Sequence, residues 1–257
     1  MPDASPRRTA SELQRDIVVP PGITIDTSRE DPRIRRIREV FRGLPAGRKV
    51  LDAGCYDGAI LGPFAKDHQL HGVDISPQGV ARANERGWHA VVHDLEAGPL
   101  PYPDKVFDVV FTGETIEHLV DTDWFLSEIN RVLLPGGRLI LSFPNVRTLT
   151  SLVMMALLDL PPKFAARYRS PHYREFTMRM IRMALANHQF EIERAMGSHF
   201  SLGPKGPVCE ALARWFPSWA DQVLVVAAKR ADSRYDPDQA IQPFLFSHST
   251  PATGGSV

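Results

Sequence analysis

The chain has 257 residues, 43% of them hydrophobic, with 30 basic and 30 acidic side chains and a formal net charge of zero. A chain of this length can bury a full core as one domain with an insertion, and its neutrality gives no general attraction for nucleic acid or an anionic membrane. The two cysteines, Cys55 and Cys209, cannot form a tetrahedral zinc site and do not indicate a disulfide framework, which fits a reducing cytoplasm.

The two ends of the chain differ in composition from its middle. Residues 1–30 and 231–257 are rich in Pro, Ser, Asp and Gly, which predicts mobile tails on either side of a domain at 31–230. The first tail carries no apolar signal region, and no apolar run reaches the ~18 residues that a membrane span requires. We therefore expect a cytoplasmic protein with no membrane span and no nucleic-acid partner.

Between the tails, strand-like and helix-like segments alternate. A first helix is expected from Asp31, which can cap it, and Pro32 in its first turn, with apolar residues along one face. Short apolar segments with polar carboxyl ends then predict five parallel strands. These are residues 49–54, 71–76, 89–94, 107–113 and 138–144.

Two further helices are predicted between these strands. One opens at Ser76-Pro77, a cap followed by proline, and closes at Gly87. The other is capped by Asp121 or Thr122 and stopped by Pro135-Gly136-Gly137. Parallel strands joined by right-handed crossovers follow, so we predict an α/β, doubly wound fold that binds its ligand beyond the carboxyl ends of the strands.

The stretch VLDAGCYDG, residues 50–58, places a glycine-bearing turn directly after the first strand. Glycines there allow a ligand to approach the backbone closely. The stretch lacks the G-x-G-x-x-G of a dinucleotide-binding turn and the lysine of a P-loop, because Tyr56 and Ala59 occupy the deciding positions. Asp52, so close to the turn, would repel pyrophosphate, and it favours a ligand that carries an ammonium or sulfonium group.

Acidic residues end the first three predicted strands. They are Asp52, Asp74 and Asp94, and the carboxyl ends of parallel strands meet at one edge of a sheet. Asp74, at the end of the second strand, can accept hydrogen bonds from both hydroxyls of a ribose, which indicates a nucleoside. A single aspartate of this kind is commonly a helix cap or a solvated turn, but three beside a glycine turn favour a binding site.

These segments resemble the class I S-adenosylmethionine-dependent methyltransferases, in the branch of small-molecule enzymes related to the ubiquinone-pathway O-methyltransferases. The resemblance runs from about Lys49 to Asn145, through VLDAGCYDG, GVDIS, HDLEAGPLPYPDKVFDVVFTGETIEHL and FLSEINRVLLPGGRLILSFPN, and continues through HYREFTMRMIRMALANHQFEI. It implies S-adenosyl-L-methionine as cofactor and a Rossmann-like seven-stranded sheet, mostly parallel with an antiparallel last strand, with helices on both faces. The segments FEIERAM and QVLVVAAK are compatible with the two closing strands.

The same resemblance implies which residues bind the cofactor. Asp52, Gly54 and Gly58 would line its methionine part, and Asp74 would accept from the ribose hydroxyls. Where the family commonly has glycine, this chain has Tyr56, whose ring is expected either to narrow the methionine pocket or to turn outward. The remaining implied contacts are Ile75 on the adenine face, Asp94 and Leu95 at the adenine edge, and Thr112 and Gly113 beneath the sulfonium.

Candidate catalytic residues follow the fourth strand, in GETIEHLVD. Glu114, Glu117 and His118 have the spacing of one helical face, which could orient a catalytic imidazole or offer a metal two oxygens and a nitrogen. For Glu117 and His118 we weigh two roles equally: a base that removes a hydroxyl proton, and structural support at the start of the helix. Metal binding ranks third, so we assign no metal ligand. His172 is the other candidate, because the resemblance places its loop over the acceptor, although a loop histidine more often faces solvent.

The connection after the fifth strand, residues 147–176, leaves the same edge of the sheet and is predicted to form a lid over the acceptor. Its apolar core, Ser151–Leu160, contains Met154 and Met155 and is ended by Pro161-Pro162. Such a helix suits a lipophilic or aromatic acceptor, or packing on the sheet or on a second subunit of a homodimer.

The activity expected from these features is methyl transfer to a small-molecule acceptor of lipophilic, aromatic or glycosidic character, at a hydroxyl oxygen. The alternative is a noncatalytic protein of the same fold that regulates a partner enzyme, which the unusual Tyr56 supports. A nucleotide-dependent oxidoreductase is disfavoured by the missing dinucleotide motif.

Overall fold

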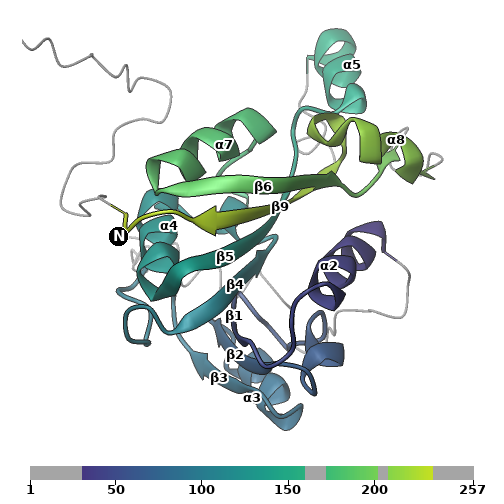
Figure 1. Cartoon of the computed structure of the whole chain (residues 1–257). Coiled ribbons are helices and arrows are strands. Elements are labelled where there is room, and N and C mark those ends of the chain that lie inside the picture. Colours follow the sequence, from purple (N-terminus) through teal and green to yellow (C-terminus); the bar gives the residue numbers. More distant parts are fainter. Residues whose placement is uncertain (1–30, 160–171, 202–207, 234–257) are drawn as a thin grey trace, which may run out of the picture.

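The computed structural model describes residues 31–159, 172–201 and 208–233 (Figure 1). The predicted N-terminal tail and all but three residues, 231–233, of the predicted C-terminal tail lie outside these ranges, as does the Pro161-Pro162 end of the insertion helix. Within the described ranges, no helix combines the length and the apolar character that a membrane span needs.

A seven-stranded sheet forms the centre of the molecule, in the order β3-β2-β1-β4-β5-β9-β6 (Figure 1). Neighbouring strands from β3 to β5 pair in parallel, and β9 runs antiparallel to both β5 and β6. The predicted doubly wound sheet with an antiparallel last strand is therefore confirmed. The strands are β1 Lys49–Ala53, β2 Gln69–Asp74, β3 His89–Val92, β4 Phe107–Gly113, β5 Leu133–Pro144, β6 Phe190–Gly197 and β9 Gln222–Lys229.

Helices cover both faces of the sheet (Figure 1). Alternate residues of each strand point to opposite faces, and the apolar side chains on both faces pack against helices. Leu51 in β1 joins a buried cluster that includes side chains of α4 and α7, whereas its neighbour Val50 joins a second cluster with α2 and α3. A small hairpin, β7 Phe200–Ser201 with β8 Val208–Cys209, precedes α8. The helices are α2 Pro32–Arg42, α3 Pro77–Glu85, α4 Thr122–Val132, α5 Leu149–Leu158, α7 Met178–Asn187 and α8 Glu210–Trp215.

The helices begin where the capping residues predict. The side chain of Asp31 accepts from the amide of Arg33, and the hydroxyl of Ser76 accepts from the amide of Gly79. For α4 the cap is Asp121, whose carboxylate accepts from the amide of Trp124 at 2.8 Å. These contacts satisfy amide groups that the first turn of a helix leaves without a backbone partner.

The carboxyl end of α4 is the main correction to the predicted elements. The helix ends at Val132 and β5 begins at Leu133, so that Pro135-Gly136-Gly137 lies inside the strand and does not stop the helix. The pairing of β4 with β5 shifts register between Phe107 and Val109, and Gly136 has a φ of 73°. Proline and glycine are tolerated there because an irregular strand segment needs no regular ladder of hydrogen bonds.

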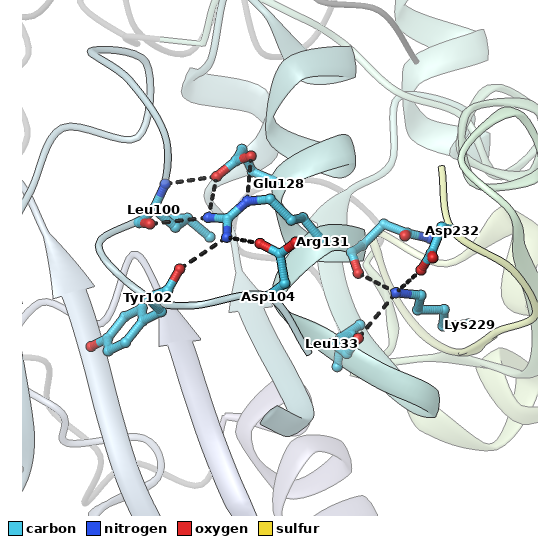
Figure 2. Close-up of polar contacts among 9 residues, drawn as sticks. Leu100, Tyr102, Asp104, Glu128, Arg131, Leu133, Lys229 and Asp232 are labelled. Atoms are coloured by element: carbon cyan, nitrogen blue, oxygen red, sulfur yellow. Dashed lines mark hydrogen bonds and ion pairs between the residues drawn. The ribbon is translucent and has the colours of Figure 1, made fainter. Parts of the chain in front are cut away.

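Arg131 connects α4 to the segment between β3 and β4 (Figure 2). Its guanidinium donates to the carbonyl oxygens of Leu100 and Tyr102, at 3.0 and 2.9 Å, and to the carboxylate of Asp104 at 2.8 Å. It also forms two hydrogen bonds with Glu128, which is buried and accepts in turn from the amide of Leu100. Most donors of this side chain therefore have partners inside the protein.

Lys229, near the end of β9, connects that strand to α4 and β5 (Figure 2). Its side chain is buried, and its ammonium donates to the carbonyl oxygens of Asn130 and Leu133, at 2.7 and 3.1 Å. An ion pair of 2.7 Å with Asp232 supplies the compensating charge. The closing strand of the sheet is in this way tied to the crossover helix.

Candidate cofactor and acceptor site

The turn after β1 is built around two glycines with positive φ. Gly54 has a φ of +90° and Gly58 a φ of +68°, values that side-chain-bearing residues rarely adopt. A Cβ atom on Gly54 would lie 2.4 Å from the hydroxyl oxygen of Thr115, and one on Gly58 would lie 2.9 Å from the ring of Trp88. Both positions therefore require glycine for conformation and for space, and Thr115 brings the end of β4 against the turn.

Tyr56 lies in the same turn with a φ of 44°, unusual for a residue other than glycine. Its ring packs on the first turn of α3, where a Cβ atom on Gly79 would lie 2.7 Å from the ring. Its amide donates to the carboxylate of Asp74 at 2.8 Å. Because Gly79 has no side chain, it leaves room for the ring, and Tyr56 is compatible with the glycine turn. Tyr56 therefore gives no support to a noncatalytic role.

The three predicted aspartates belong to neighbouring strands at one edge of the sheet. Asp52 lies inside β1, and Asp74 is the last residue of β2. Asp94 follows β3 by two residues, because that strand ends at Val92 and not at 94 as predicted, and its carboxylate accepts from the amide of Glu96 at 3.0 Å. The order β3-β2-β1 places these acids on consecutive strands.

The carboxylates of Asp52, which is buried, and Asp74, which is half-buried, give this edge its electrostatic character. Burial, and then the nearby charge of Asp74, raise the pKa of Asp52 well above its usual range. Burial also raises the pKa of Asp74, against the opposing effect of hydrogen bonds from the amides of Ser76 and Tyr56. The Oδ1 atom of Asp52 has no hydrogen-bond partner among the described residues. A bound cationic group would stabilise such a carboxylate, so the site fits the ammonium-bearing methionine part of S-adenosylmethionine.

The other predicted cofactor residues line the same edge. Ile75 follows β2 and is half-buried, and Leu95 is buried. Thr112 and Gly113 are the last residues of β4, and a Cβ atom on Gly113 would lie 2.7 Å from the ring of Phe111. The individual cofactor contacts of these residues remain predictions.

Three predicted catalytic side chains come together beyond β4. Glu117 and His118 lie in the short helical turn η2, Ile116–His118, and His172 comes from the segment before α7. One ligand-type atom from each residue lies within 4.8 Å of the other two. The Nε2 atom of His172 is 4.0 Å from the Oε1 atom of Glu117, and the two imidazole rings are 4.8 Å apart at 74°. His172 is half-buried and its ring packs against that of His118, so it is only partly open to the solvent that a loop histidine more often faces.

Backbone hydrogen bonds hold the His172 segment against η2. The amides of Tyr173 and Arg174 both donate to the carbonyl oxygen of Glu117, at 2.9 and 3.2 Å. The guanidinium of Arg174 donates to the carbonyl oxygen of Val120, at 3.0 Å through Nε. The carboxylate of Glu96 accepts from the amides of Val120 and Asp121, at 2.7 and 2.9 Å. Nothing local in the sequence marked Glu96 or Arg174 for this role, because each acts on residues distant in the chain.

Glu114 does not join this cluster, contrary to the prediction that it shares a helical face with Glu117 and His118. It has a φ of 55° and precedes the helical turn, which starts only at Ile116, so the helical spacing does not apply. Its carboxylate accepts from Ser142 at 3.4 Å and from Gln222 at 3.3 Å.

Known proteins that are similar to this chain are methyltransferases. A family model described as a methyltransferase domain matches residues 51–141. A "Probable S-adenosylmethionine-dependent methyltransferase" of Mycolicibacterium smegmatis is 30% identical over an alignment of 215 residues, which covers 77% of this chain and 79% of that protein. The 27-O-demethylrifamycin SV methyltransferase of Amycolatopsis mediterranei is 42% identical over 106 residues, covering 38% of this chain and only 39% of the relative.

The fold is shared with solved methyltransferase structures. A SAM-dependent methyltransferase of Thermotoga maritima superposes with a TM-score of 0.59 and 20% identity, over 84% of this chain and 98% of the other. Together with the sheet order and the relative aligned over most of its length, this identifies the chain as a member of the class I S-adenosylmethionine-dependent methyltransferases of the small-molecule type, with S-adenosyl-L-methionine as its cofactor.

Proposed function

We propose that this methyltransferase transfers the methyl group to a hydroxyl oxygen of a small-molecule acceptor. The observation that carries the proposal is the cluster of Glu117, His118 and His172 directly beyond β4. Thr115 precedes Glu117 and His118 in the chain, and its hydroxyl lies against Gly54 in the turn after β1, which we call the cofactor turn. The cluster is therefore next to the edge at which the methyl donor is expected.

The cluster suits an oxygen acceptor for a chemical reason. S-adenosylmethionine supplies a methyl group on a positively charged sulfur. A hydroxyl becomes a good nucleophile only as it loses its proton, whereas a neutral amine already offers its lone pair. An imidazole with a pKa of about 6.5 is an effective proton acceptor near neutral pH. The carboxylate of Glu117, 4.0 Å from His172, can orient that ring.

The similarity to a relative and the insertion after β5 support the same class of acceptor. The name of the rifamycin relative places its reaction at an oxygen. In this chain, α5 stands away from the sheet and most of its apolar side chains are exposed (Figure 1). An apolar wall of this kind suits a lipophilic or aromatic acceptor. The exposed residues of α5 are Leu149, Leu152, Val153, Met155 and Leu157.

The test is product identification with a labelled methyl group. The protein is incubated with S-adenosylmethionine bearing a deuterated methyl group and with a panel of lipophilic, aromatic and glycosylated compounds, each as a hydroxyl compound and as the matching amine. Mass spectrometry and NMR locate the label, which we expect on oxygen. A label on nitrogen or carbon would contradict the proposal, and cofactor binding without any product would favour the noncatalytic alternative.

A further inference from the structure

We infer that Glu117, His118 and His172 form a binding site for a divalent first-row transition metal, with Zn²⁺ as the probe of choice. The inference about binding rests on the geometry of the three side chains. Only the role of the metal in catalysis rests on the proposed function.

Two imidazoles and one carboxylate are a common donor set for Zn²⁺ and Fe²⁺, and they are poorly suited to Mg²⁺, which prefers oxygen. Metal–ligand bonds of about 2.0 to 2.2 Å place neighbouring ligand atoms roughly 3 to 3.5 Å apart. In this structure the three candidate ligand atoms lie within 4.8 Å of one another. Small side-chain rotations would therefore close the set around one ion.

The surroundings favour a bound cation. Glu117 is 1% exposed, so its carboxylate is shielded from water and a bound divalent cation would stabilise its charge. His118 and His172 are half-buried, which leaves a side from which an ion can enter. Three protein ligands also leave coordination positions for a further molecule, as in catalytic zinc sites.

The backbone of the site is pre-arranged. The amides of Tyr173 and Arg174, the two residues after His172, are hydrogen-bonded to the carbonyl oxygen of Glu117. Ligands contributed by two distant segments are thus fixed relative to each other before any ion binds, which lowers the entropic cost of assembling the site. The second contact of Arg174, with the carbonyl oxygen of Val120, strengthens the same connection.

A divalent cation here would act on the acceptor as a Lewis acid. Such an ion would lower the pKa of an acceptor hydroxyl bound to it, so that the hydroxyl proton could pass to water. The two imidazoles then hold the ion and do not themselves take the proton. The same residues therefore affect turnover in either case, and only a metal measurement separates the two roles.

The test uses the full chain, from which any purification tag has been cleaved and any bound metal has been removed with EDTA. Zn²⁺ is titrated in competition with a chromophoric chelator, and Co²⁺ is added to observe its ligand-field absorption. We expect one equivalent per chain, and at least about tenfold weaker binding in Glu117→Gln and in His172→Ala, because each removes a direct ligand. His89→Ala, an exposed histidine at the start of β3, is the matched control and should bind as wild type does. Stabilisation by S-adenosylhomocysteine confirms that each variant is folded.

Absence of stoichiometric Zn²⁺ binding in the wild type, or equal affinity in the wild type and in both ligand variants, would overturn the inference. The two proposals fail separately. If the stripped protein binds no Zn²⁺ and methylates oxygen equally fast with and without added Zn²⁺, the metal site is refuted and the proposed function stands. If Zn²⁺ binds through these residues but the methyl group is found on nitrogen, the metal site stands and the proposed function fails.

Discussion

Asp74 combines a structural and a predicted binding role at the scale of one side chain. Its two carboxylate oxygens accept from the amides of Tyr56 and Ser76, each at 2.8 Å. If it also holds the ribose hydroxyls, Asp74→Ala removes charge-assisted hydrogen bonds worth roughly 1.5 to 3 kcal/mol, and binding of S-adenosylhomocysteine should weaken by more than about tenfold. Calorimetry measures this, with the exposed Asp67→Ala as control. An unchanged dissociation constant in Asp74→Ala would remove the ribose role.

The buried carboxylate of Asp52, which we expect to bind a cationic group of the cofactor, should lower the stability of the cofactor-free protein. Its pKa is raised in the folded protein, so the folded state keeps a proton that the unfolded state releases. Stability from this group therefore decreases as the pH rises from the ordinary carboxylate pKa, about 4, towards the raised value, and it stays reduced above that.

Asp52→Asn should accordingly raise the melting temperature of the free protein at pH 7 and flatten its decrease with pH. The same substitution should weaken S-adenosylhomocysteine binding by about tenfold or more, because the charged partner of its ammonium group is lost. Melting curves of both proteins between pH 4 and pH 8 provide the measurement. Parallel curves for wild type and variant would show that the Asp52 carboxylate carries no such cost.

A substitution of His118 is expected to reduce activity while leaving cofactor binding nearly unchanged. Loss of a general base, or of an orienting group, typically reduces the rate by roughly 10² to 10⁴, so His118→Ala should lower kcat by that order. Its affinity for S-adenosylhomocysteine should change little, because the cofactor turn lies at Gly54 and Gly58. Steady-state kinetics and calorimetry test the pair of expectations. Normal turnover would leave His118 with a structural role only.

At the scale of elements, α5 is the part of the predicted lid that the structure describes. Met155 is 49% exposed and Met154 is half-buried, so replacing both with Ala should cost little folding stability. If α5 covers the acceptor, the double variant should raise the acceptor KM severalfold and leave cofactor affinity almost unchanged. Leu212→Ala, an equally exposed apolar residue of α8, is the control. Normal acceptor binding with a changed oligomeric state would instead assign α5 to packing between subunits.

At the scale of the whole molecule, Arg131 connects α4 to the chain between β3 and β4. Arg131→Met leaves the buried Glu128 without its cationic partner, which should lower the free energy of unfolding by about 2 to 4 kcal/mol. Arg131→Lys keeps the charge but not the planar fork, so it should restore only part of the loss. Urea unfolding measures both, and Arg230→Met, which removes an exposed pair with Glu191, should cost under about 1 kcal/mol. Equal losses at Arg131 and Arg230 would contradict this account.

The sequence by itself determined the elements and the cofactor edge, because their signals are local. Caps such as Ser76 and apolar alternation within strands depend on residues a few positions apart, and the positive φ of Gly54 belongs to a turn marked by its own glycines. Parallel strands with crossover helices then force their carboxyl ends, and with them Asp52 and Asp74, to one edge. The same local rules misplaced the end of α4, since a strand can absorb Pro135-Gly136-Gly137 as an irregularity.

The acceptor side was decided only by the tertiary structure. Residue spacing grouped Glu114 with Glu117 and His118, whereas the folded chain turns Glu114 towards β5 and β9 and supplies His172 in its place. Hydrogen bonds from the segment after His172 to the carbonyl oxygen of Glu117 hold His172 beside the cluster, and Glu114 is excluded because the helical turn starts only at Ile116. Such contacts join segments far apart in the chain, and their partners are backbone groups that every residue carries. No pattern of side chains along the sequence can therefore specify them.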